Sequence, residues 1–93
     1  MANTVVTSTT NSINVVFNDD ATLVGMTKGT WRKTHISSVA LHSSHVEVIS
    51  DVGARWITSH TTNSINALVI DSVNGVAPYS LDDLYTKLAG LLS

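Results

Sequence analysis

The sequence predicts a mainly β (α+β) fold, a small antiparallel β-sandwich or barrel of about six strands closed by one C-terminal α-helix. Val, Ile and Thr make up 30 of the 93 residues, and these β-branched side chains favour strands. Turn signals built from Gly, Asn and Asp separate short apolar runs. The last of these turns precedes a helix start signal at Ser80.

A length of 93 residues predicts one domain, spanning residues 1–93, with a thin core. We expect residues 1–10 to form an extended arm or an edge strand, residues 11–73 a β body, and residues 80–92 the C-terminal helix. The chain has no cysteine, so it has neither disulfides nor thiolate metal ligands. A formal net charge of -2 with 13% charged residues gives too weak a field to predict nucleic acid as the main partner.

The first half of the β body is predicted from apolar runs and turn residues. Residues 12–17 are typical of a half-buried strand. Asn18-Asp19-Asp20 predicts a hairpin turn, because Asn and Asp tolerate left-handed backbone and bond their own main chain. Gly25 and Gly29 bracket residues 26–28, which predicts a loop or bulge at residues 25–29 before a strand at residues 30–34.

The second half contains the clearest hairpin of the chain. Residues 36–41 form a third apolar segment. Residues 46–49 and 55–58 flank a turn in which Gly53 takes a positive φ, which predicts a β-hairpin. Residues 64–73 then give a nearly continuous apolar run, as expected for a central strand that is covered on both faces.

Several signals agree on the register of the C-terminal helix. Asn74-Gly75 predicts a turn, and Ser80 with Asp83 predicts a capping box in which Ser80 is the N-cap. Tyr79 and Leu84 then occupy the two positions of a hydrophobic staple. Asp83 and Lys87 stand at the i, i+4 spacing of an ion pair. One apolar stripe must be buried against the sheet or against another subunit: Leu81, Leu84, Tyr85, Leu88, Leu91 and Leu92.

The histidines and carboxylates do not predict a catalytic or metal site. His42 and His45 have a spacing that chelates a metal on a helix, but the surrounding chain is predicted to be strand and loop, where positions three apart point to opposite faces. Asp19-Asp20 belongs to a turn and Asp82-Asp83 to a helix N-terminus. No nucleophile elbow or phosphate-binding loop is present. We therefore predict no enzymatic activity, no catalytic, cofactor-binding or metal-binding residues, and no cofactor.

Two tryptophans lie beside cations, in Trp31-Arg32-Lys33 and Arg55-Trp56. Such pairs can stack on sugars or bases, so a small binding module for carbohydrate or single-stranded nucleic acid is the alternative function. Because neighbours on a strand point to opposite faces, Trp56 is expected in the core with Arg55 outside, and Trp31 in the core or at an interface.

The hexapeptide at residues 9–14, Thr-Thr-Asn-Ser-Ile-Asn, recurs at residues 61–66. Each copy runs into an apolar strand, but the sequences that follow do not match. The two copies of the hexapeptide are either equivalent connections that lead from a loop into a strand or the remains of an ancestral repeat, and the sequence leaves both explanations open.

The segment from Ile70 to Leu88, which contains Ile-Asp-Ser-Val-Asn-Gly followed by Asp-Leu-Tyr-Thr-Lys-Leu, is similar to the C-terminal ends of small virion-associated proteins of tailed bacteriophages. In those proteins the first phrase resembles a strand and turn, and the second a helix. The resemblance covers roughly the last quarter of the chain. It implies a structural role in the virion, as a capsid auxiliary or decoration protein or as a small head or tail component.

The resemblance implies that the partners are further copies of this chain, in a homo-oligomer, and other virion proteins, the major capsid or tail proteins. Localisation is then the virion, assembled in the host cytoplasm. The N-terminus lacks the features of a signal peptide, and no apolar run is long enough for a membrane span, so we expect a soluble chain without a membrane partner. Strand edges and the arm are expected to contact neighbouring subunits. The candidates for these contacts are Val5, Val6, Thr7, Trp31, Tyr79, Leu84 and Leu88.

Overall fold

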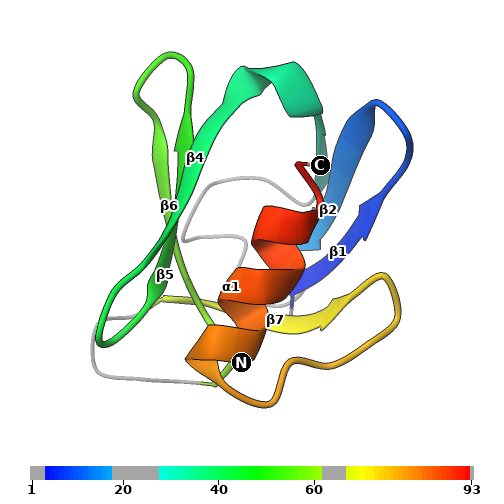
Figure 1. The fold of residues 1–93 in the computed structure, drawn as a ribbon. Coiled ribbons are helices and arrows are strands. Elements are labelled where there is room, and N and C mark those ends of the chain that lie inside the picture. The colour runs from blue at the N-terminus through cyan, green and yellow to red at the C-terminus, as the bar shows by residue number, and fades with distance from the viewer. Residues whose placement is uncertain (1–3, 18–27, 62–66, 93) are drawn as a thin grey trace.

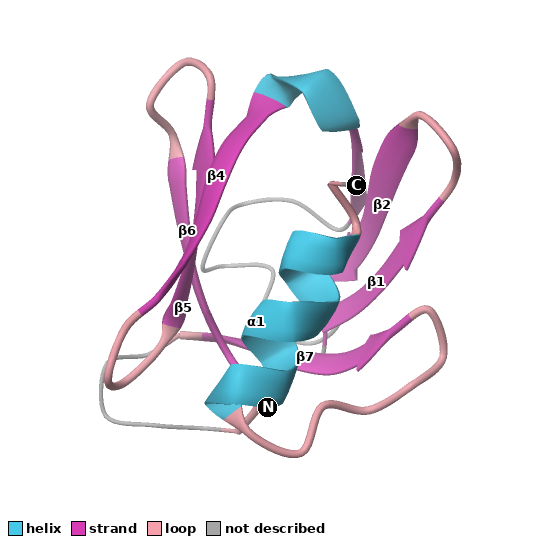
Figure 2. Cartoon of the chain, viewed as in Figure 1, coloured by secondary structure: helices cyan, strands magenta, loops and turns pink. Residues whose placement is uncertain are grey.

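The computed structural model describes residues 4–17, 28–61 and 67–92. Within them the chain is mainly β, with one seven-stranded sheet and one C-terminal α-helix, and this part of the prediction is confirmed (Figures 1 and 2). The sheet does not close into a barrel. The predicted turn at residues 18–20 lies outside the described residues, as does most of the predicted loop at residues 25–29.

The strands are β1 (Thr4–Ser8), β2 (Ser12–Phe17), β3 (Lys28–Arg32), β4 (Ile36–Leu41), β5 (Val46–Ser50), β6 (Arg55–Ser59) and β7 (Leu68–Val73), and the helix is α1 (Leu81–Gly90). A short 3₁₀ helix, η2 (Lys33–His35), joins β3 to β4, so the strand predicted at residues 30–34 begins and ends two residues earlier. The strand order is β3-β2-β1-β7-β6-β5-β4. The sheet therefore consists of two antiparallel three-stranded meanders on either side of β7.

The central strand β7 is parallel to both of its neighbours, β1 and β6. The predicted antiparallel sandwich is thus not confirmed, because the structure has one mixed sheet. The pairing with β6 is short, since only Thr58↔Leu68 and Ser59↔Val69 are in register. Sequence-based reasoning pairs strands that follow one another through tight turns, and it does not find pairs between distant segments.

The first strand lies inside the sheet. β1 pairs with β2 from Thr4↔Phe17 to Ser8↔Ile13, and on its other side it pairs with β7. Residues 4–8 are therefore neither an extended arm nor an edge strand, in contrast to our expectation. Their β-branched side chains have partners on both flanks, and Val6 is buried.

The turn residues behave as the sequence predicts. Gly53 has φ 85° in the turn between β5 and β6, a backbone conformation that glycine adopts without steric cost. Asn74 and Gly75 have φ 51° and 81°, and two consecutive positive φ values are the signature of a type I′ turn. This turn reverses the chain after β7 and directs it towards α1.

The N-terminus of α1 is capped by side chains. Ser80 Oγ accepts a hydrogen bond from the backbone N–H of Asp83 at 3.1 Å, as predicted for the N-cap. Asp83 in turn accepts from the backbone N–H of Tyr79 at 3.2 Å and from Lys87 Nζ at 3.2 Å. The predicted staple does not form, because Tyr79 is 81% exposed. The helix ends at Gly90, two residues before the predicted end.

The apolar stripe of α1 covers the inner face of the curved sheet. α1 contacts β4 and β5, and the side chain of Leu84, which belongs to the apolar stripe of α1, is completely buried. Burial of a leucine side chain contributes about 1.5–3 kcal/mol, which is a large share of the stability of so small a domain. The core cluster comprises Val6, Ile13, Val46, Ile70, Val73, Leu84, Leu88 and Leu91.

An aromatic contact joins the two meanders away from β7. Trp31 of β3 and Trp56 of β6 meet edge to face, with ring centroids 5.1 Å apart and an interplanar angle of 71°. These strands are four places apart in the sheet, so the contact requires the inner faces of the meanders to turn towards each other. Gly29 lies beneath the Trp31 ring, where an added Cβ would stand 2.7 Å from the indole.

The first prediction concerns the helix–sheet contact. Leu84→Ala should lower the free energy of unfolding by about 2–5 kcal/mol, because it opens a cavity at a fully buried position. Val52→Ala, at a site that is 85% exposed, should change it by less than about 0.5 kcal/mol. Urea unfolding followed by circular dichroism measures both. Equal effects of the two variants would mean that α1 does not pack on the sheet.

The second prediction concerns the two glycines that differ most in their surroundings. Gly29→Ala should destabilise the fold by about 1–3 kcal/mol and weaken the near-ultraviolet circular dichroism of the tryptophan pair, because the new methyl group displaces Trp31. Gly90→Ala, where a Cβ meets no heavy atom within 4 Å, should be neutral or stabilising by up to about 1 kcal/mol. An unchanged tryptophan signal in Gly29→Ala would contradict the packing described above.

Candidate functional site

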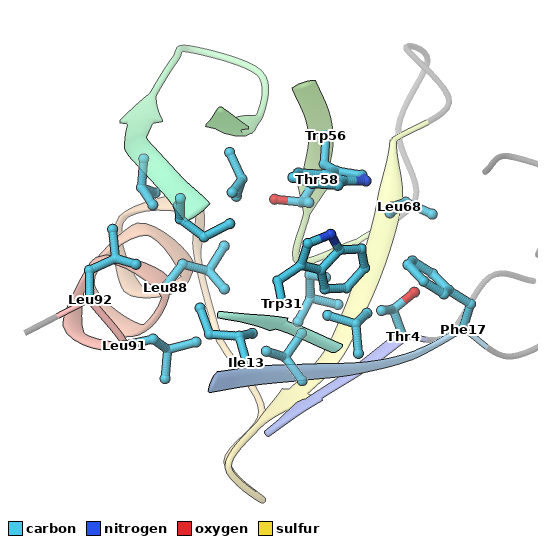
Figure 3. Close-up of a pocket in the computed structure, with 16 residues that line it drawn as sticks. Thr4, Ile13, Phe17, Trp31, Trp56, Thr58, Leu68, Leu88, Leu91 and Leu92 are labelled. Carbon is cyan, nitrogen blue, oxygen red and sulfur yellow. The ribbon is translucent and has the colours of Figure 1, made fainter. Parts of the chain in front are cut away.

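A cavity of about 70 Å³ lies between α1 and the inner face of the sheet. The indole of Trp31 projects into it, with Phe17 and Trp56 nearby, and leucines of the C-terminal segment line the other side (Figure 3). Phe17 and Trp31 meet edge to face at 6.5 Å. The lining is almost wholly apolar, so the cavity has no set of groups for acid–base or nucleophilic chemistry.

One polar atom in this wall lacks a partner. Thr4 is 1% exposed and lines the cavity, and its Oγ1 makes no hydrogen bond to any residue that the structure describes. An unpaired buried hydroxyl is costly, and a cavity of this size has room for a water molecule beside it. The simplest interpretation of the cavity is an apolar gap in the packing between α1 and the sheet, with one threonine hydroxyl in its wall.

The structure separates the predicted contact residues into two groups. The side chains of Val6, Leu84 and Leu88 belong to the core of the chain itself, and half-buried Trp31 lines the cavity. Thr7 and Tyr79 are exposed, and Val5 is half-buried. The predicted interface role of these residues stays a prediction, but only the second group offers side chains to a neighbour without opening the core.

The two edges of the sheet differ in charge. In the part of the chain that the structure describes, no strand pairs with the outer edge of β3 or of β4. β3 carries Lys28 and Arg32 at its two ends, whereas β4 reads Ile-Ser-Ser-Val-Ala-Leu, with no charge and no proline. Charged side chains and proline are the usual means by which proteins block pairing at an edge. β4 is therefore the less protected of the two edges by charge, and its one irregularity is a shift of register against β5 between Ile36 and Ser38.

His42 and His45 lie in the loop between β4 and β5, and their side chains share one face, contrary to the expectation that they point to opposite faces. His42 and His45 flank a two-residue turn between β4 and β5, and the backbone N–H of His42 donates to the carbonyl of His45 at 2.9 Å. Positions three apart point to opposite faces only along one strand, whereas His42 follows β4 and His45 precedes β5. Cross-strand neighbours share a face. The imidazole rings stack with centroids 4.5 Å apart and an interplanar angle of 18°.

Sequence reasoning missed Glu47, which lies on the same face, two residues after His45. Its Oε1 is 3.3 Å from His42 Nε2, and its Oε2 is 3.6 Å from Nη1 of Arg55. The signal that could have found it is the i, i+2 spacing on a strand after a short turn. The other two histidines stand apart from this group: His35 faces Asp51 at 3.9 Å, and His60 is half-buried beyond β6.

Comparison with known proteins does not assign this chain to a family. No protein-family model, no curated protein and no solved structure matches it. Among the described residues, no helix has the length and apolar character needed to cross a bilayer. Inference about function therefore rests on the surfaces described above.

Proposed function

We propose that this chain is a non-enzymatic structural protein of a tailed-bacteriophage virion that acts through contacts between subunits. In this proposal it is a capsid auxiliary or decoration protein, or a small head or tail component. Its partners are further copies of itself and the major capsid or tail proteins, and it resides in the virion after assembly in the host cytoplasm.

The observation that carries the proposal is the open edge of β4. Because His42 donates to His45 across the turn, the alternation of antiparallel hydrogen bonds directs the backbone N–H groups of Val39 and Leu41 away from β5. Ser37, Ser38 and Leu41 are exposed along this strand. An uncharged strand with outward N–H and C=O groups is suited to accept a further strand.

The occupant we propose for this edge is β4 of a second copy. Two identical strands pair antiparallel about a twofold axis, and each side chain then faces a residue of the same strand. Like charges directly opposite each other would oppose this pairing, and β4 has none. The same self-pairing would bring Lys28 of β3 opposite Arg32, which makes β3 the weaker candidate.

The C-terminal segment adds a second line of support. Its order of strand, turn and helix agrees with what the resemblance to phage proteins implies for residues 70–88. Val76 and Tyr79, on the connection between β7 and α1, are 55% and 81% exposed. Exposed aliphatic and aromatic side chains are the usual anchors of protein–protein contacts.

The alternative function, a small module that binds carbohydrate or single-stranded nucleic acid, requires indole faces that are free to stack on a ligand. Trp31 and Trp56 contact each other and line the internal cavity (Figure 3). This placement favours a packing role for both, so we prefer the structural proposal.

The third prediction tests pairing through β4. The chain should form a dimer in solution, and Ser38→Lys should shift it towards monomer, because the substitution places an ammonium group on each side of the paired edge. Sedimentation equilibrium over a range of concentrations measures the shift. Ala54→Lys adds the same charge at an exposed turn residue and should leave the dimer intact. A wild-type chain that stays monomeric at all concentrations would contradict pairing through β4.

The fourth prediction tests the virion assignment separately. Quantitative mass spectrometry of purified phage particles should find the chain in a fixed ratio to the major capsid or tail protein. Tyr79→Ser should lower that ratio, because it removes an exposed aromatic anchor, and Val52→Ser, at another exposed apolar site, should not. Absence of the chain from particles would refute the virion role, whatever its state of association in solution.

A further inference from the structure

A second surface of the chain carries chemistry that the proposed structural role does not use. His42, His45 and Glu47, which we call the His-His-Glu cluster, lie on the outer face of the sheet at the β4–β5 turn. Their nearest nitrogen and oxygen atoms all lie within 4.8 Å of one another. Leu41↔Val46 is the last pair of the β4–β5 ladder, so the hairpin fixes the backbone positions of all three residues.

We propose that the His-His-Glu cluster binds one divalent transition-metal ion, with Zn²⁺ as the best match. Two imidazole nitrogens and one carboxylate oxygen form a donor set that Zn²⁺ accepts. Three protein ligands leave one position of a tetrahedral ion open to solvent or to a group from another molecule.

The distances fit this assignment. With bonds of about 2.0–2.1 Å, two ligand atoms on a tetrahedral zinc ion stand about 3.3 Å apart. His42 Nε2 and Glu47 Oε1 are separated by 3.3 Å. The ligand atoms of the three residues all lie within 4.8 Å of one another. Because the rings of His42 and His45 stack, the half-buried His45 side chain has to rotate before its nitrogen can point at the same ion.

Two neighbouring groups contact the ligands from outside the cluster. Ser44 Oγ lies 3.1 Å from His45 Nδ1, and a hydrogen bond from a protonated Nδ1 to this hydroxyl leaves Nε2 as the metal ligand. Arg55 contacts Oε2 of Glu47, which leaves Oε1 to face His42. Such outer contacts are typical of metal-binding histidines and carboxylates.

Burial of the carboxylate gives a reason for a cation at this position. The Glu47 side chain is only 12% exposed, and its charged partner Arg55 is 65% exposed. A buried carboxylate is costly unless it is paired or coordinates a metal. A divalent ion at Oε1 adds a positive charge on the side that Arg55 does not cover.

The fifth prediction tests this site with the full chain and zinc chloride in isothermal titration calorimetry. One ion should bind per chain, and His42→Ala, His45→Ala and Glu47→Gln should each weaken binding by at least about tenfold. His35→Ala removes an imidazole that pairs with Asp51 elsewhere and should leave the affinity unchanged. Binding should weaken as the pH falls, because protons compete for the imidazole nitrogens.

The outcomes separate a real site from adventitious binding. Zinc should shift the ring resonances of His42 and His45 in NMR spectra of the folded wild-type chain, while those of His35 and His60 stay in place. Glu47→Gln retains the size of the side chain, and circular dichroism shows whether each variant is folded. No saturable binding, or equal binding by wild type and His42→Ala, would overturn the proposal. Neither result bears on dimerisation through β4, which the Ser38→Lys experiment tests without added metal.

Discussion

The fold depends on the position of β7 between two meanders that have no other strand pairing with each other. β1, β2 and β3 form one antiparallel unit and β4, β5 and β6 the other, and among the described residues β7 is the strand that pairs with both. On one side β7 pairs with β1, but on the other it meets β6 through two residue pairs. Backbone hydrogen bonds at this joint are too few to fix the angle between the units, so side chains must do so.

Two sets of side chains supply that constraint. Leu84 and Leu88 of α1 are buried in a cluster that contains Val6 and Ile13 from one meander and Val46 from the other. At another point of the inner face, Trp31 contacts Trp56 across the interior. A core that draws on both units makes the short β6–β7 pairing sufficient, and it explains why a chain of 93 residues can hold a sheet of this curvature.

The sequence predicted what local chemistry determines. Positive φ at Gly53, the turn at Asn74-Gly75, the N-cap at Ser80 and the β5–β6 hairpin all depend on residues close in the chain, and they are confirmed. The parallel pairs of β7 and the interior place of β1 depend on contacts between distant segments, which no local pattern encodes. The same limit applies to the His-His-Glu cluster: the prediction of strand and loop around His42 and His45 does not include the tight turn at Ser43-Ser44, which brings the two side chains to one face. Tyr79 had the right spacing for a staple, but the chain path after the type I′ turn leaves it in solvent.

The unequal edges of the sheet determine how far an assembly can grow. A sheet with two receptive edges can add copies without end and produce fibres, which is the hazard of edge-to-edge association. Here β3 carries Lys28 and Arg32, which oppose strand pairing at one edge, and β4 carries no charge. Addition of one strand to β4 would therefore leave no second uncharged edge for further addition. If copies pair through β4 as proposed, growth through this contact would stop at two copies, and a larger lattice would require other surfaces.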